Sequence, residues 1–445
     1  MKKIGCVSSV DKFYFAGDIV FHRCKEGWLV ISVQSANWLV ISSDFQKEIL
    51  ERLIAGSTIA DVYSLIINEE KMSQFKTLLA AIFARQFANT KKESDLQYLE
   101  GFKMLNCYLT NACNLKCEHC FMESGKRLKN ELTTNEWERI LKGFQAEGGK
   151  TVTFSGGEPL MNADFEYLVK YASTLGLLVT VLSNGILWTE EKIKSLSPYI
   201  SEIQISIDGV DEQTNAKIRG KGHFDKIVNT VIQFANLGVR TSVATTFTFK
   251  NLENNMDKRY KRFVAEIKSQ CKNPVFFKLS KKVLKGRDTH YTDSENLEYY
   301  QHILKIEQSL DPFAKYNNYM EGHTPNLVEK NCGFGGISIG ADGEVYYCNR
   351  ISEVESYGNI KEKPIKFFMD KGHKFHLQTS VDAITPCKDC DLRYICCGGC
   401  RIDDCNFHGK LKEFNGKLTQ IKCNEKSIQS LEQKMIDSFL FYYKF

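Results

Sequence analysis

Residues 113–120 read CNLKCEHC, with three cysteines spaced four and then three positions apart. They follow a strand-like run, residues 103–110, so we expect the thiols on one loop at the end of a strand. Thiolates are soft ligands that suit iron–sulfur clusters and zinc. Three cysteines leave one iron of a [4Fe–4S] cluster free for a small molecule. A zinc site completed by His119 or Cys107 is the alternative that the spacing leaves open.

The composition indicates the setting of the protein. The chain has 445 residues, 43% of them hydrophobic, which is enough for two or three domains. No apolar signal segment follows the first residues, and no apolar run approaches about 18 residues. We therefore expect a cytoplasmic protein with no membrane contact, in which the 16 cysteines hold metal instead of forming disulfides. The net charge of +5 is small and dispersed, which does not favour nucleic acid binding.

The N-terminal region, residues 1–92, begins with strand-like runs and continues with helical ones. The runs KFYFAG, WLVISV and NWLVIS precede FQKEILERLIAG, TIADVYSLI and KMSQFKTLLAAIFARQF. Strands followed by three helices predict a small winged-helix-like module. The charged residues 93–102 are typical of a linker.

Strand-like and helical segments alternate between residues 103 and 310. Regular alternation predicts parallel strands joined by right-handed crossovers. About six units predict an α/β fold with a partial (β/α)6 TIM-like barrel. The strand candidates are residues 103–110, 151–156, 178–184, 202–208, 239–247 and 274–280. Functional residues of such a sheet lie at the carboxyl ends of the strands and on the loops beyond them.

Residues 325–425 are rich in glycine and cysteine and show weak periodicity. Such a segment buries little apolar surface, so we expect a domain that metal stabilises. The tail, residues 426–445, has a helical pattern.

The Cys-x3-Cys-x2-Cys loop after the first strand resembles the radical S-adenosylmethionine (SAM) superfamily. The resemblance implies that Cys113, Cys117 and Cys120 ligate a [4Fe–4S] cluster whose open iron binds SAM. One electron from such a cluster cleaves SAM to a 5′-deoxyadenosyl radical, which abstracts hydrogen from the substrate.

Three later segments agree with this resemblance, each at the end of a predicted strand. SGGEP resembles the motif that presents a glutamate to the SAM amine, SNG resembles the ribose-contacting loop, and SIDG resembles a further SAM-contacting turn. An arginine in IRGKG is placed like one that meets the SAM carboxylate. The implied SAM contacts are Gly156, Gly157, Glu158, Ser183, Asn184, Ser206, Asp208 and Arg219. Taken singly, each segment is ordinary turn chemistry. No GxIxGxxP-like segment follows the fifth strand, so the adenine contacts stay open.

Seven cysteines near the C-terminus follow the order Cys-x10-Gly-x4-Cys, then Cys-x2-Cys-x5-Cys-x3-Cys, then a distant Cys. This pattern resembles the SPASM extension of radical SAM enzymes that modify peptides and proteins. The resemblance implies two auxiliary [4Fe–4S] clusters, three clusters in all. The distal cluster takes Cys387, Cys390, Cys396 and Cys423, and the proximal cluster takes Cys332, Cys348 and Cys400. A zinc ribbon is the alternative.

The proximal cluster lacks an evident fourth cysteine. Cys271 lies far upstream, whereas Cys397 and Cys405 are nearer in sequence. An open iron there suits a substrate thiolate, which favours carbon–sulfur bond formation through proximity. The turn DGEV between two short strands is expected to bring Cys332 and Cys348 together. Cys6 and Cys24 are expected to be buried small hydrophobic residues.

A winged-helix-like module before such a chain resembles the recognition element for ribosomally made peptides. That resemblance implies leader binding as an added strand, with the core peptide at the barrel mouth. A DNA-binding winged helix or a structural cap are the alternatives, although the region lacks a dense basic stripe.

The sequence therefore predicts a radical SAM peptide maturase that crosslinks a ribosomal precursor peptide, most favourably through a thioether. Such an enzyme is expected to take electrons from a donor such as flavodoxin or ferredoxin. Carbon–carbon or carbon–oxygen crosslinking is the alternative within that class. An iron–sulfur scaffold or redox-sensing regulator is the alternative outside it. The sequence marks no general base: His290, His302, His323, Tyr291 and Tyr319 are only near the domain junction.

Overall fold

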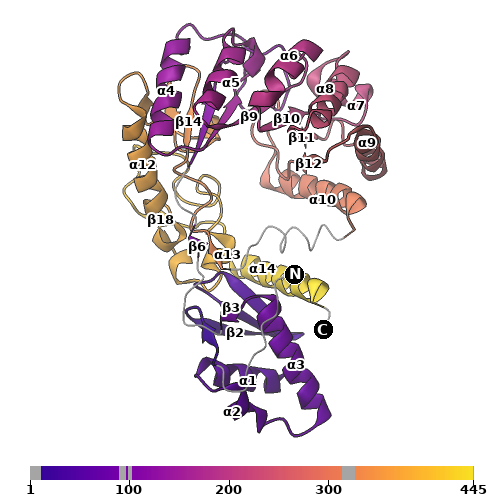
Figure 1. Cartoon of the computed structure of the whole chain (residues 1–445), viewed down its shortest axis with the longest axis vertical. Helices are drawn as coiled ribbons and strands as arrows, with labels where there is room; N and C mark the ends of the chain where they lie inside the picture. Colours follow the sequence, from indigo (N-terminus) through magenta and orange to yellow (C-terminus); the bar gives the residue numbers. More distant parts are fainter. Residues whose placement is uncertain (1–11, 90–96, 99–102, 313–325, 444–445) are drawn as a thin grey trace.

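A computed structural model describes residues 12–89, 97–98, 103–312 and 326–443. Figure 1 shows an elongated molecule with the N-terminal module, residues 12–89, at one end and a large sheet with its helices at the other. The cysteine-rich region, residues 326–424, runs between these two parts. Cys6, His323, Tyr319 and most of the predicted linker lie outside the described residues.

The N-terminal module is a three-stranded antiparallel sheet followed by helices. Its sheet order is β2-β3-β4, with a short separate β1–β5 pair. The strands are β1 (Tyr14–Phe15), β2 (Ile19–Cys24), β3 (Gly27–Ser32), β4 (Asn37–Ile41) and β5 (Ala88–Asn89). The helices are α1 (Asp44–Ile54), α2 (Ile59–Tyr63) and α3 (Glu69–Ala84). The sequence patterns located these helices but did not identify β2, whose mixture of polar and apolar residues hides its period.

The C-terminal helix α14 (Glu425–Tyr442) belongs with this module. Its buried residues Met435, Ile436 and Phe439 share one apolar core with the N-terminal sheet, α1 and α3. The Trp38 indole of β4 donates a hydrogen bond to the Met435 carbonyl over 3.2 Å. Figure 1 shows α14 (yellow) lying against the N-terminal module (indigo). The two ends of the chain therefore build one core.

The large sheet contains the six predicted strands, all parallel, in the order β12-β11-β10-β9-β8-β7. The strands are β7 (Met104–Tyr108), β8 (Thr151–Ser155), β9 (Leu178–Ser183), β10 (Glu202–Ser206), β11 (Arg240–Thr245) and β12 (Val275–Leu279). A short β6 (Gln97–Tyr98) pairs with β13 (Leu327–Val328) outside this sheet. The prediction of a parallel, partly closed α/β sheet is confirmed.

Helices from the crossovers cover this sheet, and their apolar faces follow the helical period. In α4, capping by Thr133 and Glu136 starts the helix, and Trp137, Ile140, Leu141 and Phe144 turn into the core. The helices are α4 (Thr134–Ala146), α5 (Phe165–Thr174), α6 (Glu190–Leu196), α7 (Glu212–Arg219), α8 (Phe224–Asn236), α9 (Met256–Gln270) and α10 (Asp293–Leu310). Two single 3-10 turns, η1 (Pro159–Met161) and η2 (Ser197–Tyr199), join them.

The cysteine-rich region extends the same sheet beyond β7. Strand β14 (Ile337–Ile339) runs parallel to β7, and β15 (Glu344–Tyr346) and β16 (Gly358–Asn359) follow antiparallel. Gly343 makes the predicted turn between β14 and β15 with φ +90°. The remaining elements are η3 (Ile351–Glu353), α12 (Ile365–Gln378), η4 (Val381–Ala383), β17 (Ile384–Thr385), η5 (Cys387–Asp389), α13 (Arg393–Cys396) and β18 (Leu418–Thr419). Within the described ranges, no helix has the length and apolar character needed to span a membrane.

Candidate active site

The triad loop, residues 111–125, leaves the carboxyl end of β7 and is held at its base by backbone hydrogen bonds. Cys113 N donates to Gly125 O over 3.0 Å, and Gly125 N donates to Asn111 O over 2.9 Å. The buried carboxylate of Glu131 also accepts from Asn111 N over 2.9 Å. These contacts fix where the loop starts and ends.

The neighbouring β8 end packs directly on this loop, and the packing explains its two glycines. Gly157 N and Glu158 N donate to the carbonyls of Thr110 and Ala112, each over 2.8 Å. A Cβ on Gly156 would lie 2.4 Å from Thr110 O, and one on Gly157 would lie 2.3 Å from Ala112 O. Only glycine allows this approach, and it aims Glu158 inward.

Glu158 is the central carboxylate of the site and is fully buried. Its Oε1 accepts from the Ser183 hydroxyl and its Oε2 from Asn184 N, each over 2.8 Å. Burial raises its pKa to about 7, although these hydrogen bonds act in the opposite direction. A buried acceptor of this kind suits a ligand that brings an ammonium group.

The β9 end supports Glu158. The Ser183 hydroxyl, which donates to Glu158, accepts in turn from Gly185 N and from the Trp188 indole, each over 3.1 Å. The Asn184 amide donates to the Asn114 side chain of the triad loop over 2.8 Å. The residues that the sequence predicted after β8 and β9 therefore meet at the triad loop, and Asn114 joins them without having been predicted.

Asp208 and Arg219 form a buried ion pair beside the triad. Arg219 Nε lies 2.6 Å from Asp208 Oδ2, at an angle outside hydrogen-bond alignment. Asp208 Oδ1 accepts from Thr246 N over 2.8 Å. Burial opposes the charged form of Arg219, yet Asp208 and Cys117 hold its pKa above the ordinary value. Arg219 thus places a positive charge next to the triad.

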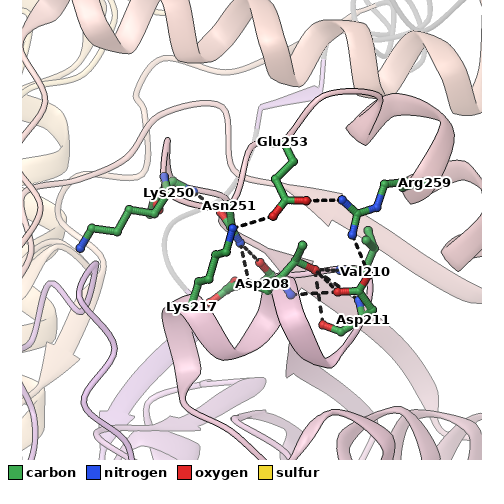
Figure 2. A network of polar contacts seen from close by, with 10 residues as sticks. Asp208, Val210, Asp211, Lys217, Lys250, Asn251, Glu253 and Arg259 are labelled. Atoms are coloured by element: carbon green, nitrogen blue, oxygen red, sulfur yellow. Dashed lines mark hydrogen bonds and ion pairs between the residues drawn. The ribbon is translucent and has the colours of Figure 1, made fainter.

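A polar network holds these residues in place behind the site (Figure 2). Glu253 accepts from Lys217 over 2.6 Å and also pairs with Arg259, which reaches Asp211 over 2.6 Å. The Asn251 amide donates to the Asp208 carbonyl. The loop after β11 is thereby fastened to the turn after β10. Ser206 is the last residue of β10, two positions before Asp208.

The three thiols of the triad loop influence one another. Burial raises the pKa of the Cys113 thiol to about 11, with smaller contributions from Glu158, Cys117 and Cys120. Burial also raises the pKa of Cys117, while Arg219 lowers it. The structure thus brings the triad, Glu158 and Arg219 into one electrostatic unit.

The sequence did not predict the segment after β12 that packs on the triad loop. Arg287 donates to Cys117 O over 2.9 Å and to Ser124 O, and its own N donates to Cys120 O over 3.2 Å. Gly286 lies so close to the His119 backbone that a Cβ would approach within 2.5 Å. No motif marks this loop in the sequence.

Glu118 of the triad loop is also engaged. It accepts from the Thr248 hydroxyl over 2.8 Å and pairs with Lys250. Beside it, the Phe249 and Tyr291 rings lie 4.9 Å apart, and the Tyr291 hydroxyl accepts from Phe249 N over 2.8 Å. Tyr291 therefore lies at the mouth of the sheet, although nothing in the sequence singled it out.

The four cysteines predicted for the distal cluster line one cavity of about 550 Å³. They are Cys387, Cys390, Cys396 and Cys423. The cavity is also walled by Ile428 and Leu431 of α14. Because α14 also packs on the N-terminal module, this helix connects the wall of the cavity to that module.

The three cysteines predicted for the proximal cluster also lie close enough for Cys332 and Cys400 to affect the pKa of Cys348. Burial raises the pKa of the Cys348 thiol to about 11, with further contributions from Cys332 and Cys400. The β14–β15 hairpin brings Cys332 and Cys348 toward each other, as the turn predicted.

The described cysteines that were assigned to neither auxiliary cluster nor the triad lie in different parts of the structure. Cys271 ends α9 ahead of β12, at the amino-terminal edge of the sheet and away from the triad. The Cys397 thiol donates to Glu329 O over 3.3 Å. Cys405 is fully buried, and Cys332 and Cys400 contribute to the raised pKa of its thiol, after burial and Asp404. Cys24, predicted to be buried, is only half-buried.

The donor sets fit iron–sulfur chemistry, because every member is a cysteine thiol. In the described part of the chain, no three cysteine, histidine or carboxylate groups converge closely enough to hold a single metal ion.

Comparison with known proteins agrees with this geometry. Residues 107–261 match the Radical SAM superfamily. The chain is 34% identical over 197 residues to the sporulation killing factor maturation protein SkfB of Bacillus subtilis (strain 168), covering 43% of this chain and 46% of that protein. It thus spans less than half the length of that relative.

Two further likenesses extend over more of the chain. An AdoMet-dependent heme synthase of Methanosarcina barkeri (strain Fusaro / DSM 804) is 25% identical over 316 residues, 66% of this chain and 89% of that protein. The structure of native anSMEcpe with bound AdoMet and Cp18Cys peptide gives a TM-score of 0.54 at 20% identity, over 77% of this chain and 98% of that one. This structural likeness concerns the fold. The match to the Radical SAM superfamily covers residues 107–261, which contain the triad loop, Glu158 and Arg219.

Proposed function

We propose that this protein is a radical SAM maturase that crosslinks a ribosomally synthesised precursor peptide. The observation that carries the proposal is the presence of two separate thiol sites in one chain. The triad loop meets Glu158 and Arg219 within the radical SAM domain, and a second cavity gathers four cysteines. A domain that only cleaved SAM needs the first site and not the second.

The residues at the first site are suited to hold SAM. Glu158 accepts hydrogen bonds from the SAM amine, and Arg219 balances its carboxylate, with Gly156 and Gly157 allowing close approach. Ser183 and Asn184 orient Glu158, and Ser206 and Asp208 supply further contacts to SAM from the end of β10. When the cluster of Cys113, Cys117 and Cys120 is bound, it supplies the electron that generates a 5′-deoxyadenosyl radical.

The cysteine-rich region supports a SPASM-type assignment with two auxiliary [4Fe–4S] clusters. The cavity of Cys387, Cys390, Cys396 and Cys423 holds the distal cluster, and Cys332, Cys348 and Cys400 hold the proximal one. Cys271, at the end of α9, lies away from the proximal set. Cys397 and Cys405 both lie near enough to Cys332 for it to affect the pKa values of their thiols, so they are the candidates within the chain. A substrate thiolate is the candidate from outside.

A substrate thiolate at the proximal site favours thioether formation over carbon–carbon or carbon–oxygen crosslinking. Proximity then joins a carbon of the core peptide to that sulfur. The N-terminal module serves as the recognition element for the leader of the precursor, which adds to its sheet edge. A flavodoxin or ferredoxin in the cytoplasm supplies electrons.

The test is anaerobic reconstitution followed by reaction with SAM, dithionite and the short peptides encoded beside the gene. We expect 5′-deoxyadenosine, and a peptide product that has lost two hydrogen atoms and contains a new thioether by tandem mass spectrometry. The variant with Ala at Cys113, Cys117 and Cys120 is the control and yields neither product.

Other outcomes separate the alternatives. A crosslink that leaves all peptide sulfurs free supports carbon–carbon or carbon–oxygen chemistry. Absence of 5′-deoxyadenosine from fully reconstituted protein favours an iron–sulfur regulator and contradicts the proposal.

A further inference from the structure

Arg350 lies beside the proximal cysteines and contacts two of them. Its Nη1 donates to Cys400 Sγ over 3.4 Å, and its backbone N donates to Cys348 Sγ over 3.5 Å. The side chain is 15% exposed, so water screens these contacts only partly. Arg350 follows β15 and directly precedes η3 (Ile351–Glu353), and no sequence motif marked it.

Two carboxylates fix the Arg350 guanidinium in this position. Asp403 accepts from Nη1 over 2.9 Å and from Nη2 over 3.1 Å, which makes a two-pronged pair. Glu353 accepts from Nε over 2.9 Å. Lys282, from the segment after β12, also donates to Asp403 over 2.9 Å. The proximal site is thereby linked to the mouth of the radical SAM domain.

Lys282, Asp403 and Arg350 form a row of ion pairs that ends at the Cys400 sulfur. Hydrogen bonds to ligand sulfurs and nearby positive charge stabilise the more negative, reduced state of an iron–sulfur cluster. The two carboxylates reduce that effect, since they balance the guanidinium. Loss of the Arg350 charge therefore makes the surroundings of the proximal cysteines more negative, whereas loss of the Asp403 charge makes them more positive.

We propose that Arg350, oriented by Asp403 and Glu353, is a positioning residue that raises the reduction potential of the proximal auxiliary cluster. This inference rests on the proposed function, because it requires a cluster on Cys332, Cys348 and Cys400. It assigns to the proximal site an electron-accepting role, whichever bond the enzyme forms.

The test is a redox titration of the fully reconstituted protein, followed by electron paramagnetic resonance. Arg350→Gln is expected to lower the reduced-to-oxidised ratio of the proximal cluster about tenfold at a fixed potential, which is about 59 mV for one electron. Asp403→Asn removes one negative charge and is expected to shift the ratio in the opposite direction. Where Arg350→Gln does not fold, Asp403→Asn decides alone.

Arg393→Gln is the matched control. Arg393 lines the distal cavity and donates to Cys390 O over 3.0 Å. It should leave the proximal potential unchanged. Iron and sulfide are counted in every sample, so that a wild-type protein without auxiliary clusters contradicts the proposed function itself. Full cluster content with unshifted potentials, or shifts of the same sign in both variants, overturns the role of Arg350. Loss of iron in Arg350→Gln alone would make Arg350 structural and also overturn it.

Discussion

At the scale of single residues, Glu158 has the most altered chemistry of the site. It is fully buried, and burial raises its pKa from 4.5 to about 7. The carboxyl group is thus protonated in mildly acidic solution before any ligand arrives. A cationic amine that binds beside it favours the carboxylate, so ligand binding and proton release are coupled.

We predict that SAM binding to reconstituted protein weakens as the pH falls below about 7. Protonated Glu158 loses its negative charge, and the affinity decreases by up to about tenfold for each pH unit below the pKa. Anaerobic calorimetric titration between pH 6 and pH 8 measures this. Glu158→Gln should bind weakly with little pH dependence. Wild-type affinity that stays constant over this range contradicts the prediction.

The raised pKa of Glu158 also makes the free energy of unfolding depend on pH. The sign of this dependence is opposite to that of a carboxyl group whose pKa is lowered by folding. In the folded protein Glu158 keeps its proton up to about pH 7, whereas the unfolded chain releases it near pH 4.5. The unliganded protein therefore loses roughly 3 kcal/mol of stability from this group as the pH rises through that window. SAM binding offsets this loss.

At the scale of elements, the segment after β12 clamps the triad loop. Arg287 donates to Cys117 O over 2.9 Å and to Ser124 O, and Asp288 N donates to Glu118 O over 2.8 Å. Most of these contacts are to backbone carbonyls, so the segment orders the course of the loop and not a particular side chain. The backbone that carries the thiols is therefore held in place by this segment.

We predict that Arg287→Gln weakens retention of the triad cluster. Each hydrogen bond from a charged donor stabilises the loop by about 1.5–3 kcal/mol, so cluster loss should accelerate at least tenfold. Bleaching of visible absorbance under a chelator measures this rate. Lys285→Gln, two residues away in the same segment, is the control. Equal bleaching rates for both variants would show that the segment does not hold the loop.

The alternation of apolar runs predicted the six parallel strands because each run carries its own local period. It did not predict that β14 joins β7, since Ile337 and Leu105 pair across most of the chain. At the site, the cysteines and Glu158 stand in spaced motifs, whereas Arg287 and Arg350 stand in ordinary loops. Their roles depend on carbonyls and sulfurs that only the folded chain brings near them.

At the scale of the whole molecule, α14 joins the distal cavity to the N-terminal module. Its first turns wall the distal cavity through Ile428 and Leu431, and its later turns fill the core of the N-terminal module through Met435, Ile436 and Phe439. His22 of β2 adds a polar link, with Nδ1 lying 2.6 Å from a Glu432 oxygen and Nε2 3.2 Å from an Asp391 oxygen. The helix was predicted as a separate tail, because its partner strands lie at the other end of the chain.

Because Cys423 directly precedes α14, a cluster bound in the distal cavity pins the start of the helix that the N-terminal module needs for its core. We predict that Cys423→Ala, or removal of iron by a chelator, lowers hydrogen-exchange protection of β3 and β4 at least tenfold, or about 1.4 kcal/mol. The variant with Ala at Cys113, Cys117 and Cys120 loses a cluster that does not touch α14, so its β3 and β4 should stay protected. If both variants lose protection equally, iron stabilises the chain in general and not through α14. If neither does, the N-terminal module folds independently of the distal cavity.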